Sequence, residues 1–233
     1  MYSNKLSLSV SSLYNLSKNR HKNISLCISE KLILGINRDE LKDVIIKFFK
    51  KCFSNEENEF SFIQFSYNGK KTLTIKSNSL EYFLQKLEKS KIAFKSKDTF
   101  NKNNNEIKFM EFSNLFLNII KSHKRINYEN KTDNIIIIFI NTSDIRFNSQ
   151  KECVDTINEL NNNNYSIIII TYDDVIEEEK IEGIYSFING LNDGHFFQVS
   201  NYQQIKQVLL NFCEKDSQEK FRDYNFEITD FML

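Results

Sequence analysis

The sequence predicts an α/β fold: a Rossmann-like, doubly wound, mostly parallel sheet with one antiparallel hairpin strand and helices on both faces. From residue 135 onward, strand-like apolar runs alternate with helical patterns three times, which is typical of parallel sheets with helical crossovers. Residues 135–140 are uninterruptedly apolar, as a central strand covered on both faces requires. Asn68-Gly69 stands between two apolar stretches and is a strong hairpin signal.

The first strand and first helix are predicted before residue 54. Residues 24–29 form a short apolar run that indicates a strand. After Gly35, apolar residues recur on one helical face: Leu41, Val44, Ile45, Phe48, Phe49 and Phe53. Acidic residues come early in this helix and lysines late, which is the charge order that complements a helix dipole.

A hairpin and a second helix follow. Residues 60–65 predict a strand, and beyond the turn Leu73 and Ile75 alternate with polar residues as in a half-buried strand. Ser79 is a suitable N-cap for a helix over residues 79–89, where apolar residues recur at helical spacing.

The remaining elements follow the alternation of strand and helix. Residues 90–106 have no sustained period and predict a basic surface loop, and a helix is expected over 109–123. After the strand at 135–140 we expect helix 150–160, strand 165–171, helix 177–189, strand 195–199 and helix 202–214. In such folds, binding sites lie at the carboxyl ends of the strands.

Composition restricts the class of protein. The chain has 233 residues, of which 40% are hydrophobic and 27% charged, so it has enough apolar mass to form a core and is not a disordered or disulfide-dense chain. Its four cysteines include no C-x-x-C pair, which gives no support for a zinc knuckle or a redox dithiol. We divide the chain into an N-terminal extension (1–23), an α/β domain (24–213) and a C-terminal tail (214–233).

The formal net charge of zero hides a strong asymmetry. Residues 1–131 hold 24 Lys and Arg against 13 Asp and Glu, whereas residues 132–233 hold 7 against 18. The halves therefore carry +11 and −11, which predicts a dipolar molecule whose ends favour partners of opposite sign. The alternative interpretation is drift in a chain with a biased composition.

The order of elements across residues 24–213 resembles a von Willebrand factor A (vWA) domain. The most specific segments are the apolar strand ending in residues 139–143, the strand at 165–170, and the stretch at 188–199 that precedes the last helix. This resemblance implies the vWA fold and, in most of its members, a metal-ion-dependent adhesion site that holds Mg²⁺.

The residues of that adhesion site are largely missing here. The family places Asp-x-Ser-x-Ser after the first strand, but this chain has Ser29 followed by Glu-Lys-Leu-Ile; where the family has Asp-Gly, Thr142-Ser143 stands instead. A hard divalent cation needs several oxygen ligands that include carboxylates. We therefore predict a degenerate site with no bound metal and no cofactor, whose remnant candidates are Ser29, Ser143 and Asp144.

No motif indicates catalysis. Phosphate-binding glycine motifs and a nucleophile elbow are absent, so we assign no catalytic residue and predict that the chain is not an enzyme. An acidic group at the end of one strand is a candidate cation or basic-partner site: Asp173, Asp174, Glu177 and Glu178. The alternative, which we weigh as the stronger, is that these residues cap the next helix and fill its first turn.

Two other segments are candidates for partner binding. Lysines with interleaved aromatic residues gather around the predicted basic loop, at Lys86, Lys89, Lys91, Lys95 and Lys97. They are candidates for an electrostatic contact with a protein partner or, less favoured, with a nucleic-acid backbone; a solvated loop is the commoner interpretation of such a segment. The tail ends in an apolar segment that includes Phe231 and Leu233 and is able to dock on a partner.

The sequence thus favours a non-catalytic protein-interaction or scaffold domain, a subunit of a larger intracellular complex. Alternatives are a degenerate metal- or nucleotide-binding enzyme and a nucleic-acid-associated protein. No apolar run is long enough to cross a bilayer, so a cytoplasmic location is expected. Residues 1–29 lack acidic side chains, as transit peptides do, so targeting to mitochondria or another organelle is the alternative.

Overall fold

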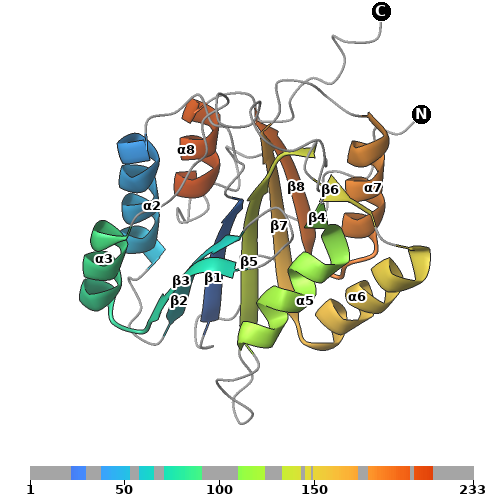
Figure 1. The fold of residues 1–233 in the computed structure, drawn as a ribbon, viewed down its shortest axis with the longest axis horizontal. Helices are drawn as coiled ribbons and strands as arrows, with labels where there is room; N and C mark the ends of the chain where they lie inside the picture. Colours follow the sequence, from blue (N-terminus) through green and yellow to red (C-terminus); the bar gives the residue numbers. More distant parts are fainter. Residues whose placement is uncertain are drawn as a thin grey trace, which may run out of the picture.

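A six-stranded sheet lies between two layers of helices (Figure 1). The computed structural model describes residues 22–29, 38–52, 58–65, 71–90, 110–123, 133–142, 145–147, 149–172, 178–199 and 202–211. Helices α2, α3 and α8 cover one face of the sheet and form the first layer; α5, α6 and α7 cover the other and form the second layer.

The strand order confirms the predicted fold class. The strands of the sheet are β1 (Lys22–Ser29), β2 (Glu59–Phe65), β3 (Lys71–Ser77), β5 (Asp133–Ile140), β7 (Tyr165–Tyr172) and β8 (Gly194–Val199). They lie in the order β3-β2-β1-β5-β7-β8, so the hairpin is on one side of the first strand and the later strands on the other. Only the β2–β3 pair is antiparallel.

The helices are α2 (Arg38–Cys52), α3 (Leu80–Lys89), α5 (Phe112–His123), α6 (Gln150–Asn162), α7 (Glu178–Asn189) and α8 (Tyr202–Asn211). Ser79 is the N-cap of α3, as predicted, and its Oγ accepts a hydrogen bond from the Tyr82 amide. Ser149 begins α6 with a capping box, because its side chain accepts from the Glu152 amide while the Glu152 carboxylate accepts from the Ser149 amide.

The structure corrects the start of one helix. We expected a helix from residue 109, but α5 begins at Phe112 because Met110–Glu111 form the short strand β4, which pairs with β6 (Ile145–Arg146). Strands of two residues have no period to detect, so the sequence pattern could not reveal this pair. The predicted basic loop beyond Ser90, the extension before Lys22 and the tail at 214–233 lie outside the described residues.

The uninterrupted apolar run of β5 is explained by the two helical layers, which cover both faces of this strand. Ile135, Ile137 and Phe139 belong to the core under the first layer, whereas Ile136, Ile138 and Ile140 belong to the core under the second layer. Successive side chains of a strand point to opposite faces. When helices cover both faces, every side chain is buried, and apolar residues are therefore favoured at each position. Burying each such side chain stabilises the fold by about 1.5–3 kcal/mol.

Candidate functional site

Helix α3 presents a structured outer surface. Its buried residues Phe83 and Leu87 face the sheet, so the helix is fixed by its apolar side. At 100° per residue, Tyr82, Lys86 and Lys89 then fall on a single outward stripe, because they are spaced by four and three residues. We call these three residues the α3 stripe.

The α3 stripe combines an aromatic ring with two cations. Tyr82 is 51% exposed and is one of two exposed large hydrophobic side chains among the described residues. The Lys86 Nζ lies 5.3 Å from the centre of the Tyr82 ring, within the range of a cation–π contact. Lys89 is exposed in the last turn, where its charge also complements the helix dipole. The stripe therefore has an aromatic ring at one end and two cations along the rest of its length.

A shallow hollow of about 500 Å³ borders this stripe. Its walls include Glu81, Gln85 and Glu88, which follow each other at helical spacing on the adjacent side of α3. Lys42 of α2 donates a hydrogen bond from its Nζ to the backbone carbonyl of Glu88, which links the two helices beside the hollow.

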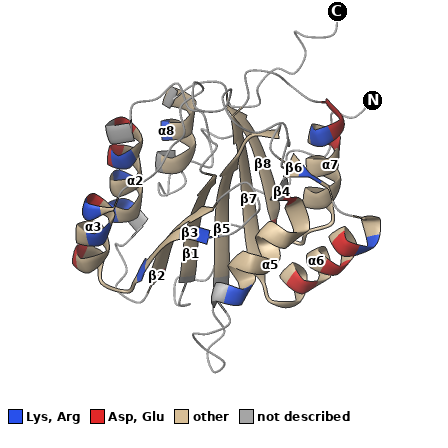
Figure 2. Cartoon of the chain, viewed as in Figure 1, with Lys and Arg blue, Asp and Glu red and all other residues tan. Residues whose placement is uncertain are grey.

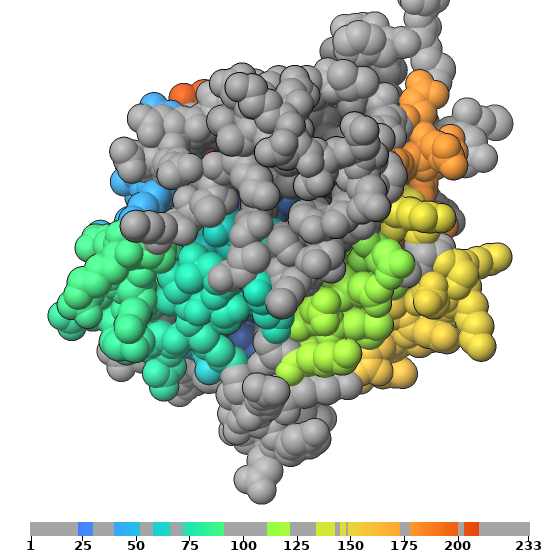
Figure 3. Space-filling view, in the orientation of Figure 1, coloured from blue at the N-terminus to red at the C-terminus, as the bar shows by residue number. Residues whose placement is uncertain are grey.

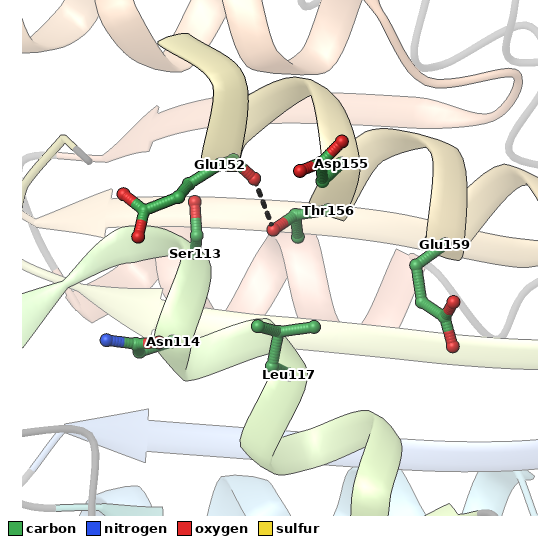
Figure 4. Close-up of a pocket in the computed structure, with 7 residues that line it drawn as sticks. All are labelled: Ser113, Asn114, Leu117, Glu152, Asp155, Thr156 and Glu159. Carbon is green, nitrogen blue, oxygen red and sulfur yellow. Dashed lines mark hydrogen bonds between the residues drawn. The ribbon is translucent and has the colours of Figure 1, made fainter. Parts of the chain in front are cut away.

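The second layer contains a groove of the opposite charge. It has a volume of about 300 Å³, lies between α5 and α6, and is lined by Ser113, Asn114, Leu117, Glu152, Asp155, Thr156 and Glu159 (Figure 4). Three carboxylates come from α6, while the apolar Leu117 points from α5 into the space between the helices. We call this feature the α6 groove.

Two hydrogen bonds fix the wall of the α6 groove. The Thr156 hydroxyl donates to the Glu152 carbonyl oxygen over 2.8 Å, and the Glu152 carboxylate is held by the capping box at Ser149. Asp155 and Glu159 follow on the same face, three and seven residues after Glu152. The groove therefore presents a row of carboxylates on a rigid helix.

The two helical layers differ in charge as a whole (Figure 2). The helices of the first layer hold eight Lys and Arg against five Asp and Glu, whereas those of the second layer hold three against six. The asymmetry seen along the sequence is thus also present in space, across the sheet. Helix α8 joins the first layer although it comes from the acidic half of the chain.

Polar residues gather at the carboxyl edge of the sheet. Ser29 ends β1, Asn141 and Thr142 follow β5, and Thr171 lies at the end of β7, three strands that are adjacent in the sheet. All four are buried, and the Thr171 Oγ1 has no hydrogen-bond partner among the described residues. This edge is where an α/β sheet places a ligand.

The described side chains at this edge do not by themselves fit a divalent cation. The side chains that the structure describes there offer hydroxyl and amide oxygens but no carboxylate, and a hard cation needs carboxylates among its ligands. Within the described ranges there is also no group of three or more His, Cys, Asp or Glu side chains that could hold a metal ion. Ser143 and Asp144, the other two remnant candidates, lie outside the described residues.

One histidine is part of a clip at the opposite edge of the sheet. Asp193 accepts a hydrogen bond from the Ser166 Oγ over 2.5 Å, and its other carboxylate oxygen lies 3.0 Å from the His195 Nε2. His195 is only 7% exposed. The three residues join the start of β7 to the turn before β8, so this histidine has a structural role.

Burial makes the Cys27 thiol chemically inert. The side chain is completely buried in β1 under the second layer, and burial raises the pKa of its thiol because a thiolate would lose its hydration there. The charge of Lys71 offsets only part of this effect. The thiolate is the reactive form, so Cys27 is a core residue and not a nucleophile.

The predicted partner-binding residues are only partly described. Lys86 and Lys89 are exposed in the first layer, and Glu178 is exposed at the first turn of α7 in the second layer. These residues lie in different layers, so the structure does not bring them into one site. The others lie outside the described residues: Lys91, Lys95, Lys97, Asp173, Asp174, Glu177, Phe231 and Leu233.

Sequence reasoning missed two features of these surfaces. Tyr82 was not predicted as a binding residue, although it lies four residues before Lys86, a spacing that makes two residues neighbours on a helix. The α6 groove was missed because it depends on the packing of α5 against α6. Among the helices that the structure describes, none is long and apolar enough to cross a membrane.

Comparison with known proteins supports the fold through structure alone. No protein-family model matches the sequence, and no curated protein matches it. The VWA domain of SpRpn10 is similar in structure, with a TM-score of 0.54 at 15% identity over 82% of this chain and 94% of that one. BatB from Bacteroides thetaiotaomicron has a TM-score of 0.51 at 11% identity over 85% of this chain and 99% of that one.

A third similar structure is the pilus adhesin SpaC from Lactobacillus rhamnosus GG in its open conformation. It has a TM-score of 0.56 at 8% identity, and the match covers 88% of this chain and 31% of the adhesin chain. These matches agree with the strand order and with the helices on both faces of the sheet. The chain therefore has a von Willebrand factor A-like fold.

Proposed function

We propose that this chain is a non-catalytic protein-interaction domain that works as a subunit of a larger intracellular complex. The observation that carries the proposal is the α3 stripe, where Tyr82 is exposed and within cation–π distance of Lys86, with Lys89 further along the same side of the helix. Tyrosine is enriched among the residues that dominate protein interfaces.

The chemistry of the α3 stripe favours an acidic partner. Carboxylates on the partner would pair with the two lysines, while an apolar group would cover the tyrosine ring. Exposed ion pairs contribute about 0–1 kcal/mol each, so the aromatic contact carries most of the affinity and the lysines set orientation and rate. The remaining predicted residues of this basic region, Lys91, Lys95 and Lys97, would extend the same surface.

The rest of the molecule supports an interaction role. Opposite charge on the two layers orients the domain before contact, because long-range fields steer association. The acidic group at Asp173, Asp174, Glu177 and Glu178 and the apolar end at Phe231 and Leu233 are proposed as further contacts. One structural neighbour is named as a pilus adhesin.

Chemical crosslinking of the tagged, full-length chain in its own cells tests this proposal. We expect one defined set of neighbours, which is lost when both lysines of the stripe are reversed (Lys86→Glu with Lys89→Glu). The matched control is Lys50→Glu with Lys51→Glu, which changes the charge equally on exposed positions of α2 in the same layer. Equal loss with both variants, or no loss with either, would contradict the proposed role of α3.

A small-ligand site at the carboxyl edge of the sheet is the second candidate. The buried Thr171 Oγ1, which has no hydrogen-bond partner among the described residues, favours it because a buried hydroxyl is stabilised by a partner. This candidate corresponds to the degenerate metal- or nucleotide-binding enzyme that the sequence left open. A rise of the melting temperature with a nucleotide, lost in Thr171→Val, would support it over the interaction domain.

A further inference from the structure

The two charged surfaces of this molecule are complementary to each other. The α3 stripe lies on the first layer, and the α6 groove lies on the second, so a single molecule cannot bring them together. Figure 3 shows α3 on one side of the visible face and α5 and α6 on the other. Two copies arranged head to tail place the stripe of one molecule against the groove of the next.

We infer that the occupant of the α6 groove is the α3 stripe of a second copy of this chain. This inference rests on the proposed interaction function and names one partner for the same α3 surface. Such a contact joins two different patches, so it is heterologous and leaves one stripe and one groove open at the ends of every chain of molecules.

The spacing of the charged residues fits this contact. Tyr82 and Lys89 are seven residues apart on α3, and Glu152 and Glu159 are seven residues apart on α6, so each row spans about 10 Å of helix. Within these rows, Lys86 and Lys89 are three residues apart and Asp155 and Glu159 are four apart. Two lysines can therefore meet two carboxylates when the helices lie side by side.

The apolar parts of the two surfaces also correspond. Tyr82 is 51% exposed beside the lysines, and Leu117 points into the space beside the carboxylates. In the docked arrangement the ring covers the leucine, and the two ion pairs lie beside it along the helices. A standard interface buries about 800 Å² of surface on each partner, and one helix face buries less than this. The contact is therefore weak, and it depends on concentration and salt.

Sedimentation velocity of the purified full chain over a range of concentrations tests the inference. We expect association at low salt that weakens about tenfold in Lys86→Gln with Lys89→Gln (the stripe variant). An equal loss is expected in Asp155→Asn with Glu159→Gln (the groove variant). The control, Lys50→Gln with Lys51→Gln, removes the same charge from the first layer and should associate as the unmodified chain does.

Mixing the two variants identifies the geometry. The stripe variant keeps an intact groove and the groove variant keeps an intact stripe, so an equimolar mixture should form dimers, and only dimers, at concentrations where each variant alone, about tenfold weaker in association, stays monomeric. Thermal melts equal to that of the unmodified chain show that the variants are folded. A mixture that stays monomeric, or an unmodified chain that is monomeric at all concentrations, would overturn the inference.

The two experiments test self-association and the proposed function separately. If the purified chain is monomeric but crosslinked neighbours in cells are lost in the stripe variant, the second-copy inference fails and the interaction function stands. If the purified chain associates through its stripe and groove but no other protein is crosslinked to it, the inference stands and the larger complex is excluded.

Discussion

The two helical layers have similar interiors and opposite exteriors. Under the first layer, Phe49 is completely buried and contacts three other phenylalanine rings; under the second, Phe112 is completely buried and also contacts three. The outer surfaces differ, because the first layer carries the α3 stripe and the second the α6 groove. Packing therefore does not distinguish the layers, whereas the charge on their outer surfaces does.

The largest expected effects come from breaking either interior. Phe49→Ala and Phe112→Ala should each lower the free energy of unfolding by about 3–5 kcal/mol, because each removes a buried ring and leaves a cavity. Urea denaturation measures both. Similar losses would confirm that the interiors are equivalent; a loss below about 1 kcal/mol for either one would show that its layer is loosely packed.

A smaller loss of stability is expected from substituting Gly183, a glycine of the second layer that packs against an aromatic ring. A Cβ at Gly183 of α7 would lie 2.4 Å from Cε2 of the Phe147 ring, so Gly183→Ala forces the ring or the helix to move. We expect a net loss of about 1–2 kcal/mol although alanine has the higher helix propensity. Gly190→Ala is the control, since its Cβ would meet the end of the flexible Ile157 side chain and should cost less. A more stable Gly183→Ala protein would contradict this packing.

Alkaline pH should destabilise the protein through two groups in the core under the second layer. Burial raises the pKa of the Cys27 thiol, and burial followed by the charge of Glu159 raises the pKa of Tyr165, both of which belong to the core under the second layer. Below their usual pKa values both groups stay protonated in the folded and the unfolded chain. Above those values the unfolded chain loses these protons first, so stability falls as pH rises past about 9.

Two substitutions test that pH dependence. Cys27→Ala and Tyr165→Phe should each flatten the decline in melting temperature between pH 9 and 11, even if they lower stability at pH 7. An unchanged slope in both variants would show that other groups control the alkaline transition.

The smallest expected effect is that of Mg²⁺. The hydroxyl and amide oxygens described at the carboxyl edge are poor ligands for this ion, so millimolar Mg²⁺ should change the melting temperature by less than about 1 °C. A clear rise, abolished in Ser29→Ala or Asp144→Asn, would show that a cation site persists there and would favour the second candidate function.

The sequence predicted the fold better than the surfaces. The uninterrupted apolar run of β5 and the helical spacing in α3 depend on neighbouring residues, so both elements could be predicted, together with the Ser79 cap. The β4–β6 pair and the α6 groove depend on contacts between residues more than 30 positions apart, which no local pattern reveals. Lys86 and Lys89 were predicted as binding residues. Tyr82 became a candidate only when the structure placed its exposed ring beside Lys86.

The native size of the protein in its own cells, measured at low and at high salt, tests the central claim most directly. The interaction account predicts a defined species well above the 27.7 kDa of a single chain at low salt, which shifts to smaller sizes as salt screens the charged surfaces. A species of 27.7 kDa at both salt concentrations would contradict it, and attention would then move to the carboxyl edge of the sheet as a small-ligand site.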